Sequence, residues 1–178
     1  MTEFNADSMH RLAKMALDSG DVASPEEAMA LFSRYRLRIH LGHGWADTLA
    51  GQASFLTALN TAVRAFLGGV EVYGDLDLAL DVPLYQGRSA REVAKELGTA
   101  VVTSTTTELP TLVLGAPPDA PAPAFCVQLA WDHWRFQIAP VGADGALTCV
   151  DDNPLAGIGA AALGVNEAFM HVRGDLAE

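Results

Sequence analysis

The chain contains 178 residues, of which 50% are apolar, and this composition predicts one globular core rather than a disordered segment. Its formal net charge is −11, from 11 basic and 22 acidic residues, which argues against a surface for nucleic acid or an anionic membrane, because both need clustered Lys and Arg. No apolar run approaches the roughly 18 to 20 residues that cross a bilayer. Glu3 and Asp7 stand where a signal peptide would carry basic residues, so we expect a cytoplasmic location.

Residues 1–35 are predicted to form a helical appendage. Two short helices over about residues 5–35 are separated by a break at Ser19-Gly20. The second has a strong start, because Ser24 can cap it, Pro25 follows at the first helical position and two acids lie in the first turn. We expect this hairpin to pack beside a main sheet.

Residues 36–178 are predicted to form one α/β domain. Residues 36–41 alternate like a strand and lead into the glycine turn Gly42-His43-Gly44. Residues 52–67 carry apolar side chains at helical spacing, and residues 70–73 form a second strand. The order strand, glycine turn, helix, strand opens a doubly wound fold, so the predicted class is α/β with a Rossmann-like three-layer sheet.

The later elements continue this pattern. Ser89 and Glu92 form a capping box for a second helix in this domain, which ends before Gly98. Short β-branched segments follow at residues 99–103 and 111–114, and residues 125–130 and 135–139 are predicted to form a hairpin. The proline-rich residues 115–123 are expected to form a semi-rigid surface loop.

The last helix is unusually poor in charge. Asn153 is its predicted cap, Pro154 occupies its first turn, and residues 155–165 are almost entirely small or apolar. A helix of this composition is expected to be buried on most of its circumference, either across the core or in a subunit interface. We therefore expect residues 154–172 to form the working surface.

Candidate ligand-binding residues gather at the ends of the first two strands. The pattern Gly42-x-Gly44-x-x-Asp47 resembles a phosphate loop, but its third glycine position is a carboxylate that would repel phosphate. Asp75 and Asp77 follow the second strand, where a ribose or a magnesium ion can bind. Acids after a strand are also common solvated loop residues, so both interpretations stay open.

The glycine turn, the acidic segment and the late small-residue helix ending Asn166-Glu167-Ala168-Phe169 together resemble the ThiF-type adenylating proteins, the bacterial relatives of ubiquitin-activating enzymes. The resemblance covers about residues 36–173. It implies that Gly42 and Gly44 match the loop that holds ATP phosphates, and that Asp75 or Asp77 matches the acid that holds the ribose.

Several features of this family are missing here. There is no Asn-x-x-Arg-Gln segment, only Gln86-Gly87-Arg88, and there are no paired Cys-x-x-Cys sites. The resemblance thus implies an inactive, non-ATP-binding N-terminal half of a longer protein. Such a domain would dimerise or act as structural partner of an active adenylating domain, without a cofactor.

A second hypothesis keeps the crevice functional. An enzyme or sensor could bind a small, less anionic ligand between residues 42–47 and 75–77, because strand ends at a switch point form such a crevice. Exchanging Asp47 for Gly separates the two hypotheses, since a working site would lose its ligand.

The other polar residues and the cysteines give weaker indications of a functional site. His40, His43 and His133 with Asp132 are not expected to converge on a metal, and Cys126 and Cys149 are expected to be buried as small hydrophobes. Residues 131–135 form either an interface or a packed hairpin, and Asp151-Asp152 are expected to stabilise the start of the last helix. Ser104, within the run 103–107, is predicted to line a loop entrance rather than act as a nucleophile.

Overall fold

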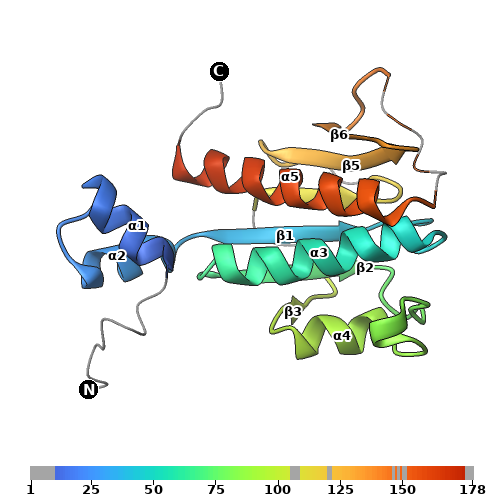
Figure 1. Cartoon of the computed structure of the whole chain (residues 1–178), viewed down its shortest axis with the longest axis horizontal. Coiled ribbons are helices and arrows are strands. Elements are labelled where there is room, and N and C mark those ends of the chain that lie inside the picture. The colour runs from blue at the N-terminus through green and yellow to red at the C-terminus, as the bar shows by residue number, and fades with distance from the viewer. Residues whose placement is uncertain are drawn as a thin grey trace.

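A computed structural model describes residues 11–104, 109–119, 122–145, 147, 149 and 152–174 (Figure 1). In chain order the elements are α1 (Arg11–Ser19), α2 (Pro25–Phe32), β1 (Arg36–Leu41), α3 (Leu49–Ala65), β2 (Gly69–Gly74), the 3-10 helix η2 (Pro83–Tyr85), α4 (Ala90–Glu96), β3 (Ala100–Val101), β4 (Thr111–Leu114), β5 (Cys126–Asp132), β6 (Arg135–Pro140) and α5 (Pro154–Arg173).

The strands form a single sheet in the order β3-β2-β1-β4-β5-β6. Its first five strands are parallel, and β6 pairs antiparallel with β5 as the predicted hairpin. The strand order reverses between β1 and β4, which is the switch point of a doubly wound fold. The predicted Rossmann-like α/β class is therefore confirmed.

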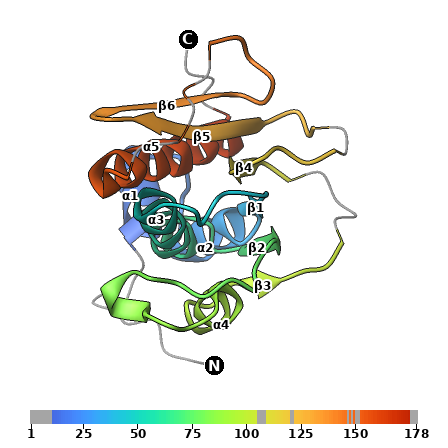
Figure 2. The same ribbon diagram turned by 90° about the vertical axis from the view of Figure 1, so that its right-hand side faces the viewer.

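One face of the sheet carries the hydrophobic core. Alternate residues of neighbouring strands point to it, including Ile39, Val72 and Leu112, which lie side by side in register. Helices α3 and α5 pack on this face and against each other, as Figure 2 shows from the carboxyl ends of the parallel strands. Phe55 of α3 and Ala160 of α5 are fully buried there.

The opposite face of the sheet is more polar. In the part of the chain that the structure describes, loops between the strands lie on this side, as Figure 2 shows. Arg38 and His40 point to this face, yet they are only 5% and 7% exposed. Gly115, at the start of the proline-rich connection, accepts a hydrogen bond from Gln128 Nε2 at 3.1 Å. This difference between the two faces explains why polar and apolar residues alternate along β1, although the strand is buried.

Small residues let α5 approach its neighbours closely. A Cβ at Gly157 would lie 2.2 Å from the Ala50 carbonyl oxygen of α3, and one at Gly164 would lie 2.4 Å from Leu129. Leu155, Ile158 and Leu163 are nevertheless exposed on the outer side, so within this chain the core covers only part of the circumference that is expected to be buried. By length and composition alone, α5 is also long and apolar enough to cross a membrane. Core helices of soluble proteins meet the same criteria, and 44% of the most apolar 18-residue stretch of α5 is buried in this structure.

The appendage matches its prediction within the described residues. Ser24 accepts a hydrogen bond from Glu27 N at 3.1 Å and caps α2. Phe32 and Tyr35 form an aromatic contact with each other, and both contact Phe169 near the end of α5. The appendage therefore closes one end of the core, although the division into residues 1–35 and 36–178 stays a prediction.

Two elements differ in length from their predictions. Helix α3 begins at Leu49, earlier than expected, because the Thr48 side chain caps it by accepting Gly51 N. Strand β3 is shorter than predicted, since it pairs with β2 only through Glu71 and Val72.

Candidate functional site

The glycine turn lies between β1 and α3, as the sequence predicts. It packs against the backbone at the end of β4 and in residues 115–116. Gly42 N donates to Leu114 O at 2.9 Å, and Ala116 N donates to His43 O at 2.9 Å. A Cβ at Gly42 would stand 1.7 Å from the Ala116 carbonyl oxygen, and one at Gly115 would stand 2.6 Å from Gly42 O. The glycines are thus required where two backbone segments meet at the switch point.

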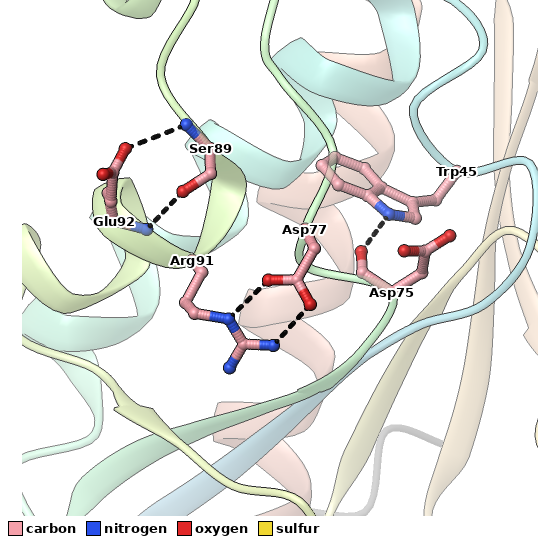
Figure 3. A network of polar contacts seen from close by, with 6 residues as sticks. All are labelled: Trp45, Asp75, Asp77, Ser89, Arg91 and Glu92. Atoms are coloured by element: carbon pink, nitrogen blue, oxygen red, sulfur yellow. Dashed lines mark hydrogen bonds and ion pairs between the residues drawn. The ribbon is translucent and has the colours of Figure 1, made fainter.

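Trp45 fills the space between this turn and the acidic segment. Its side chain is 2% exposed, its ring lies 4.8 Å from that of Phe55, and its Nε1 donates to the Asp75 carbonyl oxygen at 2.7 Å (Figure 3). The indole therefore joins the first strand's turn to the end of β2. The crevice expected between residues 42–47 and 75–77 contains this ring.

The amino-terminal N–H groups of α3 are bonded to oxygen atoms of the chain. Asp152 Oδ1, from the segment before α5, accepts Leu49 N at 2.5 Å and lies 3.4 Å from Ala50 N. Thr48 accepts Gly51 N at 3.1 Å. In nucleotide-binding domains these N–H groups face a phosphate, whereas here a carboxylate of the same chain lies at the positive helix end.

Gln52 adds a polar brace beside this helix end. Its Nε2 donates to Ala46 O at 3.0 Å, and its Oε1 accepts Asp81 N at 2.7 Å and Val82 N at 3.3 Å. Because Gln52 is 2% exposed, these three bonds fix the turn to the segment after β2.

The acidic residues are placed outside this packed region. Asp47 is exposed, with its Oδ2 3.4 Å from the position of a Gly44 Cβ. Asp75 is exposed too, and its backbone N donates to Leu41 O at 2.8 Å. The structure thus brings Gly42, Gly44 and Asp47 together in one turn and holds Asp75 beside it through Trp45.

Asp77 has a partner that sequence reasoning missed. Arg91 of α4 donates to both carboxylate oxygens, at 2.7 and 3.1 Å, as Figure 3 shows. This hydrogen bond lowers the pKa of Asp77 and raises that of Arg91. The sequence signal was available only indirectly, since Arg91 lies in the first turn of a helix whose capping box, Ser89 and Glu92, was predicted.

The remaining candidates do not converge. Within the described ranges, no group of three His, Cys, Asp or Glu residues is placed to hold a metal ion. His133 and Arg135 both bond to Asp132 at the hairpin, and Trp131 is buried whereas Trp134 is 75% exposed. Cys126 is buried and Cys149 half-buried, and burial raises the pKa of both thiols. Asp151 and residues 105–107 lie outside the described residues.

A polar cluster on the face opposite α3 was not singled out from the sequence. Arg36 and Arg38 of β1 donate to Glu71 of β2, at 2.5 and 3.0 Å. The guanidinium of Arg38 lies 5.9 Å from the ring of Tyr73, whose centroid is 4.5 Å from that of His40. Burial is the main cause that lowers the pKa of His40 and raises that of Tyr73. The alternation of Arg36, Arg38 and His40 along one strand was the available signal.

Fold and site together define a class of protein: an α/β domain with the strand order of nucleotide-binding proteins, in which the chain's own groups lie at the glycine turn and at the adjoining helix end. The model of the BilD N-terminal domain family matches residues 36–178, so the chain belongs to that family.

A known protein that is similar in sequence supports this family membership. The chain is 33% identical over 168 residues to the bacterial E1-like protein BilD of Collimonas sp. (strain OK412). This match covers 94% of the chain but 36% of the relative, so the chain spans about a third of that protein's length. No solved structure matches the chain significantly. The expected relationship to ubiquitin-activating, E1-like proteins is confirmed at this coarse level.

Proposed function

We propose that this chain is a non-catalytic, adenylation-like domain of an E1-like protein, resembling the inactive half of ThiF-type adenylating pairs. Its role is structural: it dimerises or packs against an active adenylating domain. The observation that carries the proposal is the bonding of Asp152 to the first N–H groups of α3, where a phosphate would otherwise lie.

Two further observations support a domain without a nucleotide. The Trp45 indole fills the crevice between the glycine turn and Asp75, and this also speaks against the alternative of a small-ligand enzyme or sensor. Asp47 adds an exposed carboxylate at the turn, and the guanidinium of Arg91 is bonded to Asp77, as Figure 3 shows. A triphosphate would meet carboxylates rather than charge-compensating Lys or Arg.

The proposed partner rests on the E1-like relative and on the share of its length that the chain covers. The relative is an E1-like protein with most of its length outside the matched region, so an adenylating domain is the partner class that fits. The net charge of −11 supports a protein partner rather than nucleic acid or an anionic membrane, and is consistent with a cytoplasmic protein.

The decisive experiment is a titration of the purified chain with Mg-ATP by calorimetry, with the combined fluorescence of its three tryptophans as a second readout. We expect no binding up to about 1 mM nucleotide. An Asp47→Gly variant is the matched test, because a relic of a nucleotide site would gain weak anion affinity or stay unchanged. A Kd below about 100 µM for Mg-ATP binding to the wild type would show a working nucleotide site and refute the proposal.

A further inference from the structure

Half of the exposed large apolar side chains gather in one place. Among the described residues, ten large hydrophobic side chains are exposed, and five of them lie on β6, its turn and α5; we call these five the α5–β6 surface. They are Trp134 (75% exposed), Phe136, Leu155 (59%), Ile158 (38%) and Leu163. Contiguous apolar surface of this kind, containing a Trp, marks a protein–protein interface more often than chance.

Contacts within the domain show that these residues adjoin one another. The ring of Phe136 lies directly against Gly159 of α5, where a Cβ would be 2.6 Å away. Leu155 and Leu163 are one helical turn before and after Gly159, so they flank that ring. Asn153 Nδ2 donates to His133 O at 2.8 Å and fixes the start of α5 beside the turn that carries Trp134.

The same surface adjoins an open edge of the sheet. β6 is the last strand, and over the described part of the chain no strand pairs with its outer side. Between Arg135 and Pro140 its residues are uncharged. The other edge strand, β3, is only two residues long, which is one of the ways proteins blunt an edge. Arg135 and Pro140 end this six-residue strand, and the four uncharged residues between them, beside apolar side chains, are a template for strand pairing.

Charge favours a second copy of this chain as the occupant. Each copy carries a net charge of −11, so two copies can approach closely only where acids are few. Strand β6 has none, α5 has only Glu167 among its 20 residues, and the nearby Asp132 bonds to His133 and Arg135. Two copies of the chain can therefore contact each other through their α5–β6 surfaces without bringing carboxylates of the two copies together.

We infer that two copies of this chain pair through antiparallel β6 edges about a twofold axis perpendicular to the sheet. This axis joins the two sheets and places both α5 helices on the same side, so that the α5–β6 surfaces adjoin. The inference deepens the dimerising role given under Proposed function by naming the surface and the partner.

Sedimentation velocity of the purified chain from about 1 to about 200 µM tests the pairing. We expect a dimer that a Leu155→Glu/Ile158→Glu variant weakens by at least about tenfold, since both side chains are exposed and their replacement leaves the core intact. Leu84→Glu is the matched control, because Leu84 is 81% exposed in η2 and should leave dimerisation unchanged.

Hydrogen exchange then locates the contact. Amides of residues 135–140 should exchange more slowly as dimer forms, because the outer edge of β6 becomes paired. A wild-type chain that stays monomeric at about 200 µM overturns the inference, as does a dimer that the double variant leaves intact. Both results are independent of the ATP titration, so failure of the pairing and failure of the non-catalytic role can be told apart.

Discussion

At the scale of single residues, the glycine turn is explained by the contacts of the free protein. Gly42 has no room for a side chain, because the Ala116 carbonyl oxygen occupies the position of a Cβ. A glycine kept for a phosphate would instead face open space when no nucleotide is present. The turn therefore contributes to folding in its own right.

We predict that Gly42→Ala lowers the free energy of unfolding by about 2 to 4 kcal/mol, because the backbone of the 115–116 segment must move. Gly20→Ala is the control: a Cβ there meets nothing within 4 Å, and its positive φ of 78° costs about 1 kcal/mol. Urea unfolding measures both variants. Equal losses would mean that the contact with Ala116 is not needed.

His40 predicts a pH dependence of stability. Burial lowers its pKa in the folded chain below the ordinary value of 6.5. As pH falls below about 6.5 the unfolded chain binds a proton that the folded chain does not yet bind, so stability present above this pH is lost. The loss has a slope of at most about 1.4 kcal/mol per pH unit for one group.

Urea unfolding at several pH values between about 7.5 and 5.5 measures this slope in the wild type and in His40→Gln. The variant carries no ionisable group at this position, so its stability should fall less over the same range. If both proteins lose stability in parallel, another group is responsible.

At the scale of elements, the start of α3 is held by a residue from the far end of the domain. Asp152 lies just before α5, yet its carboxylate bonds to Leu49 N and lies near Ala50 N. This contact joins the amino-terminal ends of two helices that pack along each other. An acid at a positive helix end is stabilising, and here it also fixes the position of α5.

We predict that Asp152→Ala lowers the free energy of unfolding by about 1 kcal/mol, whereas Asp152→Asn, which keeps an acceptor oxygen, loses less. Asp144→Ala is the control, because Asp144 is an exposed loop acid and should change stability by under about 0.5 kcal/mol. Thermal or urea unfolding compares the three. A loss in Asp152→Ala no larger than in Asp144→Ala would show that the helix end does not need the carboxylate.

Local chemistry made most elements predictable, and long-range contacts made the site unpredictable. Ser24, Ser89 and Asn153 cap helices as expected, because a cap depends on neighbours two or three residues away. The self-contacts of the site join residues such as Trp45 and Asp75, or Leu49 and Asp152, which no local pattern connects. The sequence left open how much of α5 its own domain covers, because apolar composition does not distinguish burial in the core from burial in an interface.

At the scale of the whole molecule, the distribution of contacts separates two regions. The carboxyl ends of β1 and β4 are closed by Trp45 and the 115–116 segment, whereas the α5–β6 surface is exposed and apolar. A domain in an E1-like protein that binds no nucleotide would act through such a surface. Its acidic net charge of −11 then opposes every association with another acidic molecule.

This charge predicts how the pairing of two copies responds to salt. Raising NaCl from about 25 to about 300 mM shortens the Debye length from about 19 Å to below 6 Å and screens repulsion between the two copies. Apolar contacts and strand pairing are little affected, so the dimer should tighten several-fold. Sedimentation velocity at each salt concentration measures the change, with Leu84→Glu as a control that adds one acid to each copy away from the interface. Weakening with salt would instead show that ion pairs hold the two copies together, which the acid-poor α5–β6 surface does not provide.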